Sequence, residues 1–89
     1  MTKYKILISS KAQKDKQKIK QYKVLKDKVD ILLNIITQNP YQIPPDYEKL
    51  SGKLVDTFSR RINKQHRLVY EVFKNKKIVR ILSMWSHYE

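Results

Sequence analysis

Three strand-forming segments follow one another in the last third of the chain, and they restrict the fold more than any other feature. Residues 57–62, 67–73 and 78–84 are each rich in β-branched and aromatic side chains. The connections between them, residues 63–65 and 74–77, are short enough for antiparallel hairpins. The sequence therefore predicts an antiparallel sheet, which has to bury one face against another part of the chain.

An apolar stripe in the middle of the chain predicts the helix that covers this sheet. The stripe falls at spacings of four, three and four residues and consists of Leu25, Val29, Leu32 and Ile36. This spacing places the stripe on one face of a helix over residues 25–36. A more polar segment, residues 12–22, predicts a solvated helix with Ser9 or Ser10 as its N-cap. Whether the two segments form a helical hairpin or one bent helix stays open.

The chain before and after these helices completes the expected order of elements. Residues 4–8 predict a first strand. Pro40 ends the second helix, and a loop of roughly fifteen residues, longer than most connections, runs from there to about Asp56. The order β-α-α-β-β-β predicts a single α+β domain over residues 1–89. In this domain two helices pack on one face of a mainly antiparallel sheet, and the other face is free for a ligand.

The chain is strongly basic, and the excess charge is spread along it. Its formal net charge is +12 over 89 residues, and residues 1–30 alone carry ten lysines against three aspartates. A folded domain with this charge is expected to bind polyanions such as nucleic acid, with strong salt dependence. A solubilising surface or an acidic protein partner explains the charge equally well, so composition alone does not choose between these interpretations.

Composition disfavours several classes of protein. One glycine excludes a glycine-rich phosphate loop, and two histidines without any cysteine offer too few ligands for a zinc site. A two-metal nuclease needs clustered carboxylates, whereas Asp46, Glu48, Asp56 and Glu71 lie singly. We therefore expect no metal and no cofactor. No apolar run is long enough to span a membrane, and the amino terminus lacks the apolar core of a signal peptide, so we expect the cytoplasm.

Metal-free RNA cleavage is the chemistry that the remaining polar residues suit. It needs a base for the 2′-hydroxyl, a cation for the phosphorane and an acid for the departing 5′-oxygen, and Glu48, Arg67 and His87 supply these in order. Histidine suits the acid because its unperturbed pKa is about 6.5. Three alternatives stay open: a surface ion pair of Glu48 with Lys49 or Lys53, a scaffold ion pair for Arg67, and an inert terminal His87.

Further residues are candidates for contact with RNA. Arg60 and Arg61 are adjacent in a predicted strand and point to opposite faces, so at most one of them reaches the same site directly. Lys49 follows the candidate base in the sequence. Trp85 and Tyr88 are able to stack on bases, although an aromatic side chain after a strand more often covers the core.

Four short motifs occur in a fixed order across residues 47–88. They are Tyr47-Glu48-Lys49-Leu50, Ser59-Arg60-Arg61-Ile62, His66-Arg67-Leu68-Val69-Tyr70 and His87-Tyr88. With their spacing, these motifs resemble the Txe/YoeB family of bacterial toxins, which belongs to the RelE/ParE superfamily of small β-α-α-β-β-β proteins. The lysine-rich residues 1–30 carry no matching motif, and Glu89 follows the tyrosine at which some members end.

The resemblance implies a toxin of a type II toxin–antitoxin system that inhibits translation by cleaving mRNA in the ribosomal A site. Attack by the 2′-oxygen leaves a 2′,3′-cyclic phosphate or 3′-phosphate and a 5′-hydroxyl, so DNA is expected to be inert. Carried over position by position, Glu48 takes the role of the general base and His87 that of the general acid. Arg67 stabilises the phosphate, with Arg61 or Arg60 assisting. Tyr88 takes the place of the family's penultimate or terminal tyrosine.

The resemblance also implies partners. These are mRNA and the ribosome as targets, a YefM-like antitoxin whose carboxyl-terminal segment covers the toxin, and a second copy of the chain, since members are known as dimers. Two other functions stay open: a ParE-like toxin that acts on DNA gyrase, and a non-enzymatic RNA- or ribosome-binding protein. The presence of both Glu48 and His87 favours the ribonuclease, because an inhibitor that acts by binding needs neither a base nor an acid.

Overall fold

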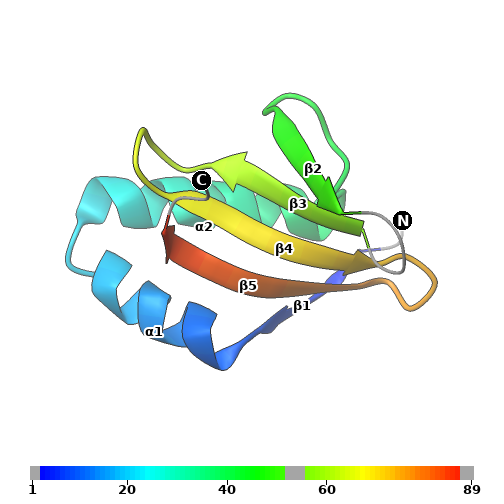
Figure 1. Cartoon of the computed structure of the whole chain (residues 1–89), viewed down its shortest axis with the longest axis horizontal. Coiled ribbons are helices and arrows are strands. Elements are labelled where there is room, and N and C mark those ends of the chain that lie inside the picture. The colour runs from blue at the N-terminus through cyan, green and yellow to red at the C-terminus, as the bar shows by residue number, and fades with distance from the viewer. Residues whose placement is uncertain (1–2, 52–55, 87–89) are drawn as a thin grey trace.

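A computed structural model describes residues 3–51 and 56–86 and shows a five-stranded sheet with two helices packed on one face (Figure 1). The elements in chain order are β1 (Lys5–Ile8), α1 (Ser10–Ile19), α2 (Lys23–Gln38), β2 (Tyr47–Ser51), β3 (Asp56–Arg61), β4 (Arg67–Phe73) and β5 (Ile78–Ser86). The predicted α+β class is confirmed. Within the described part of the chain, no helix has the length and apolar character that a membrane crossing requires.

The sheet has the strand order β1-β5-β4-β3-β2. Its centre is the predicted antiparallel meander, in which Phe58 of β3 pairs with Tyr70 of β4, and Tyr70 pairs with Ile81 of β5. On the far side β1 runs parallel to β5, with Ile6 opposite Val79. A parallel pair needs a long connection, and here both helices and the strands β2, β3 and β4 lie between β1 and β5 in the chain.

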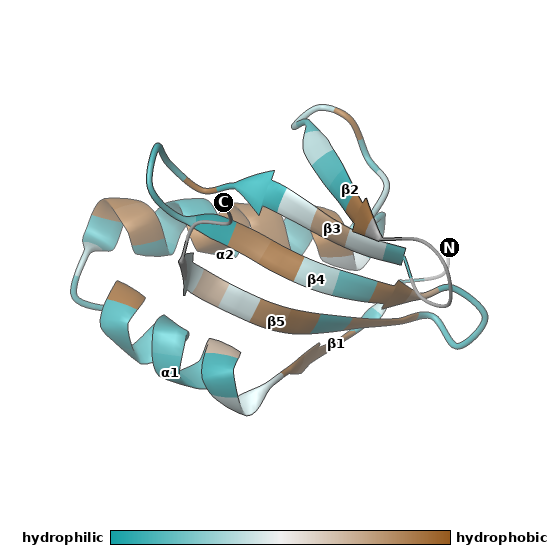
Figure 2. Cartoon of the chain, in the orientation of Figure 1, coloured by the Kyte–Doolittle hydropathy of each residue, from teal (hydrophilic) through white to brown (hydrophobic). Residues whose placement is uncertain are grey.

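One hydrophobic core lies between the helices and the sheet. The predicted stripe of α2 supplies Val29, Leu32 and Ile36, all buried, while Leu25 packs at the edge of the core. Figure 2 shows α1 as mostly hydrophilic and α2 with hydrophobic residues at intervals. Burial therefore follows the periodicity that the sequence predicts. The buried cluster from the sheet consists of Phe58, Ile62, Leu68, Tyr70, Val72, Val79, Ile81 and Met84.

The two helices form separate elements, which settles the alternative that the sequence left open. Helix α1 begins after Ser9, whose Oγ accepts a hydrogen bond from the Ala12 amide at 3.1 Å, as the N-cap prediction requires. It ends at Ile19 rather than at residue 22. Tyr22 instead stands at the N-cap position of α2 and stacks on Trp85, so the turn is stabilised by a tertiary contact.

The predicted loop from residue 40 to about 56 is wrong in its second half, because β2 lies there as an edge strand (Figure 1). Tyr47 packs its ring on Phe58 at a centroid distance of 4.7 Å, and the next residue, Glu48, pairs with Ser59. The strand has little apolar content of its own and is stabilised by pairing with β3. At the other end of the chain, β5 continues to Ser86, beyond the predicted residue 84.

Candidate active site

A polar cavity with a volume of about 380 Å³ opens where β2, β3 and β4 meet. It contains two of the three catalytic candidates, Glu48 and Arg67. Both side chains stand on the sheet face that carries no helix, which is the face predicted to be free for a ligand. The lining residues are Pro45, Asp46, Tyr47, Glu48, Arg61 and Arg67.

Strand alternation explains why these side chains meet. In β3, Phe58 points into the core, so Ser59 and Arg61 point to the open face. In β4 the same alternation buries Leu68 and turns Arg67 to the open face. Because Arg61 is paired with Arg67, the two guanidinium groups belong to neighbouring positions of one surface.

A short chain of polar contacts orients the candidate arginine. Arg67 Nε donates a hydrogen bond to Ser59 Oγ at 2.6 Å, and Arg67 Nη2 lies 3.8 Å from Glu48 Oε1. The Arg67 side chain is 20% exposed, whereas that of Glu48 is 69% exposed. Arg67 is therefore held from below by Ser59, and its outer edge and Glu48 stay accessible to a ligand.

Ser59 is a site residue that the sequence analysis missed. It is completely buried and pairs with Glu48 on one side and with Val69 on the other. Its position two residues before Arg61 in the same strand places it on the same face. This spacing was the signal in the sequence that could have identified Ser59. It indicates a contact with Arg67 only once the register between β3 and β4 is known.

Arg60 does not lie at this site, and the expectation that it contacts RNA is wrong. Its side chain is fully buried on the helix side of the sheet. Its guanidinium donates hydrogen bonds to the carbonyl oxygens of Pro40 at 3.1 Å and Gln42 at 2.9 Å, and to that of Pro45. Because the side chain is fully buried and each of its three nitrogens donates to another group of the protein, a phosphate has no access to it. Arg60 instead holds residues 40–45, the segment that precedes β2, against β3 through these hydrogen bonds.

Tyr70 completes the support beneath this segment. Arg60 Nε donates to the Tyr70 hydroxyl at 3.0 Å, and that hydroxyl donates to the Pro40 carbonyl at 2.8 Å. Burial raises the pKa of Tyr70, against the opposing effect of the hydrogen bond and charge of Arg60. Tyr70 therefore stays a neutral donor at physiological pH. The position of Pro45 in the cavity wall depends on these buried contacts.

Lys49 and Trp85 are also placed away from the cavity. Lys49 pairs with Phe58 in the register, on the core side of the sheet, and its Nζ lies 3.5 Å from Asp56 Oδ1. Asp56 also accepts a hydrogen bond from Tyr41, whose pKa is raised to about 12 by burial and by this carboxylate. The structure therefore gives Lys49 a local acidic partner, Asp56, rather than Glu48.

Trp85 is half-buried in a stack of rings at the end of β5. Its ring centroid lies 4.2 Å from that of His66 and 5.6 Å from that of Tyr22. Lys18 Nζ lies 6.0 Å from the centroid of the Trp85 ring. These contacts join the β3–β4 hairpin to the turn between the helices. The alternative that Trp85 covers the core is therefore the one that the geometry favours.

The remaining candidates, His87 and Tyr88, lie outside the described residues, as do Glu89 and Lys53. Their predicted roles stay predictions. Among residues 3–51 and 56–86, no three His, Cys, Asp or Glu side chains gather closely enough to hold a metal ion. The described site therefore contains two carboxylates, Asp46 and Glu48, and two guanidinium groups, Arg61 and Arg67, in one cavity. Of the two carboxylates, Glu48 is the one that forms an ion pair with Arg67.

Comparison with known proteins shows which family and which solved structures this chain is similar to. The family described as "YoeB-like toxin of bacterial type II toxin-antitoxin system" matches residues 10–88. A YoeB dimer from Staphylococcus aureus is 35% identical with a TM-score of 0.77, over 96% of this chain and 98% of that chain. A YoeB–YefM complex from the same organism gives 36% identity, a TM-score of 0.76 and the same coverage.

More distant structures share the fold alone. The archaeal RelE–RelB complex from Pyrococcus horikoshii is 24% identical, with a TM-score of 0.82 over 97% of this chain and 96% of that chain. Among curated protein sequences none matches this chain. The fold is therefore shared well beyond the range in which the sequence is similar.

Proposed function

This chain belongs to the YoeB-like toxins of bacterial type II toxin–antitoxin systems, and from that premise we propose that it is an endoribonuclease that cleaves mRNA in the ribosomal A site. The observation that carries the proposal is the contact between Glu48 and Arg67 in an open polar cavity. A carboxylate beside a guanidinium supplies two of the three groups that metal-free phosphodiester cleavage requires, because the carboxylate removes a proton while the guanidinium stabilises the negative charge that develops at the phosphorane.

The proposed reaction uses the residues in a fixed sequence. The Glu48 carboxylate takes the proton of the 2′-hydroxyl, and the 2′-oxygen attacks the adjacent phosphorus. Arg67, with Arg61 beside it, stabilises the phosphorane, and the bond between phosphorus and the 5′-oxygen breaks. His87 donates a proton to that oxygen. The products are a 2′,3′-cyclic phosphate upstream and a 5′-hydroxyl downstream.

Positioning accounts for the separate contributions of the two arginines. Arg67 is fixed by Ser59, so it offers a preorganised charge to the phosphate and loses little entropy when the substrate binds. Arg61 is exposed and free to follow the phosphate as its geometry changes. We therefore assign the larger share of transition-state stabilisation to Arg67 and a substrate-holding role to Arg61.

A protein partner is part of the same proposal. The similar proteins from S. aureus were solved as a YoeB dimer and as YoeB–YefM complexes. We propose that a YefM-like antitoxin neutralises this chain and that two copies of the chain associate. The net charge of +12 favours an antitoxin segment that carries carboxylates.

The decisive experiment is to map mRNA ends in a reconstituted translation system, with ribosomes present or omitted. We expect the wild type to make defined cuts in the A-site codon only when ribosomes are present. Glu48→Gln, Arg67→Ala and His87→Ala should each lower the cleavage rate about 100-fold or more. Glu71→Gln is the matched control, because Glu71 is a carboxylate of the same open face outside the cavity.

Two results would contradict the proposal. Full cleavage by all three variants would show that Glu48, Arg67 and His87 do not have the assigned roles. Arrested growth without any cut would instead indicate a toxin that acts by binding, such as a gyrase inhibitor.

A further inference from the structure

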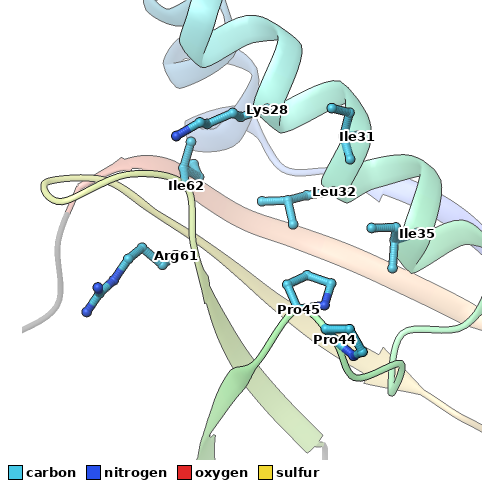
Figure 3. Close-up of a pocket in the computed structure, with 8 residues that line it drawn as sticks. All are labelled: Lys28, Ile31, Leu32, Ile35, Pro44, Pro45, Arg61 and Ile62. Carbon is cyan, nitrogen blue, oxygen red and sulfur yellow. The ribbon is translucent and has the colours of Figure 1, made fainter.

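A second cavity, with a volume of about 440 Å³, opens between α2 and the two consecutive prolines that precede β2 (Figure 3). Ile31, Leu32 and Ile35 project from α2 toward the prolines, which form the opposite wall. Ile31 is 60% exposed, so this apolar wall is open to solvent. We call this cavity the α2 groove. Its lining residues are Lys28, Ile31, Leu32, Ile35, Pro44, Pro45, Arg61 and Ile62.

The α2 groove adjoins the candidate active site. Pro45 and Arg61 line both cavities, so the two spaces share part of their walls. Arg60 donates a hydrogen bond to the Pro45 carbonyl, which fixes the proline side of this shared wall. A ligand whose charged part lies at Arg67 and Arg61 therefore has the groove beside it.

The groove has a distinct chemical character. Its walls are aliphatic or proline, and its only charged lining residues are Lys28 and Arg61, both cations. No carboxylate lines it among the described residues. A fitting ligand therefore has an apolar body and a negatively charged group close by. A nucleotide has this character, because its base offers flat apolar faces and its backbone carries the phosphate.

We propose that the α2 groove binds one nucleobase of the RNA strand, next to the phosphate that is cleaved. The proposal rests on the proposed function, since it needs RNA in the adjoining cavity. Its dimensions favour a base over a protein segment: 440 Å³ is in the range of small-ligand pockets, whereas a docked helix is about 10–12 Å wide and needs a longer groove.

The contacts available in the groove define how the base is held. Pro44 and Pro45 lie on one side of the groove, and Ile31 and Ile35 lie on the other. Arg61 stands at the boundary, where its planar guanidinium is able to stack on the base or to pair with the phosphate. Such contacts are tolerant of base identity, so the groove contributes to affinity and to alignment of the RNA more than to sequence specificity.

The test uses ribosomes programmed with short, end-labelled synthetic mRNAs. One series carries the normal bases, and in the others a single nucleotide on the 5′ or 3′ side of the cut is abasic. We expect the wild type to lose about tenfold in single-turnover cleavage rate when the base at one of these positions is removed. Ile31→Gln should cleave the normal mRNA about tenfold more slowly and show no further loss with that abasic mRNA.

Val24→Gln is the matched control for this test. Val24 is also an exposed apolar residue of α2, 71% exposed, but it does not line the groove. It should behave like the wild type on every mRNA. Thermal melting of both variants checks that neither change disturbs the fold.

The outcomes separate this inference from the proposed function. If the wild type cleaves but is indifferent to each abasic position, or if Ile31→Gln keeps the wild-type sensitivity, the inference is overturned. If Ile31→Gln alters only neutralisation by an antitoxin, the groove docks a protein and the inference is likewise overturned. If the wild type makes no cut at all, the proposed function fails, and the inference fails with it.

Discussion

The carboxylate of Asp15 in α1 accepts a hydrogen bond from the backbone amide of Met84 in β5, at a distance of 3.0 Å. The same oxygen accepts a bond from the Trp85 amide at 3.3 Å and from Lys11 Nζ at 2.9 Å. Asp15 is only 4% exposed. A buried carboxylate thus fixes the end of the strand that leads to His87, the proposed general acid.

Loss of this carboxylate is expected to destabilise the fold. Asp15→Ala leaves the buried amide of Met84 and that of Trp85 without their partner, so we expect the free energy of unfolding to fall by about 3 kcal/mol. Urea denaturation measures this change. Asp27→Ala is the control: Asp27 is exposed and lies 3.8 Å from Lys23, so its loss should cost about 0.5 kcal/mol or less. Equal effects of the two changes would contradict this account.

The stability contributed by Asp15 is expected to depend on pH. Burial disfavours its charged form, but hydrogen bonds from the Met84 amide and Lys11 outweigh this effect and lower its pKa below the ordinary value of 3.8. Stability from ionised Asp15 is therefore fully present above about pH 4 to 5 and is lost as the pH falls through the lowered pKa. The stability difference between wild type and Asp15→Asn should stay constant near neutral pH and shrink on acidification. A stability difference that grows below pH 4 would show that the pKa of Asp15 is not lowered in the folded protein.

Arg60 is expected to be essential to the fold rather than to RNA contact. Arg60→Lys keeps the charge but cannot reach three backbone carbonyls and the Tyr70 hydroxyl at once. We expect a loss of about 3 kcal/mol and a melting temperature lower by roughly 10 °C or more. Arg80→Lys, at an exposed position of β5, should change stability by less than about 0.5 kcal/mol. A stable Arg60→Lys protein with weakened RNA binding would reverse our assignment.

Ser59 is expected to act as a positioning residue for Arg67. Ser59→Ala removes the 2.6 Å bond to Arg67 Nε, so we expect the single-turnover cleavage rate to fall about tenfold while ribosome binding is retained. Ser83→Ala is a close control, because Ser83 is also a buried serine of the sheet and its hydroxyl has no hydrogen-bond partner among the described residues. Comparable losses in both variants would show that the effect is not specific to Arg67.

Lys14 of α1 is expected to contribute more to RNA affinity than Lys23 and Lys26 of α2. Lys14 has no acidic partner within the described chain, whereas Lys23 and Lys26 pair with Asp27 and Asp30. Lys14→Gln should therefore lower the slope of log affinity for ribosomes against log salt by about one unit, and Lys23→Gln should lower it less. Binding measured at several potassium chloride concentrations gives both slopes. A larger effect of Lys23 would contradict the expectation.

Local patterns determined much of this protein in advance. The meander of β3, β4 and β5 follows from strand propensity and short connections, and the buried face of α2 follows from its apolar spacing. The cap at Ser9 was equally readable. These features are predictable because each depends on residues close together in the sequence. The family motifs also pointed to Glu48 and Arg67, which the structure brings into one cavity.

Only the tertiary structure decided the roles of neighbouring charged residues. Arg60 and Arg61 are adjacent and chemically identical, yet one is buried beneath a loop and the other faces the cavity. The choice depends on the pairing of β3 with β4 and on carbonyl groups 15 to 20 residues away. Edge strand β2 likewise forms because β3 offers it unpaired backbone groups. Contacts between distant segments have no local periodicity, and so they become visible only when the chain is folded.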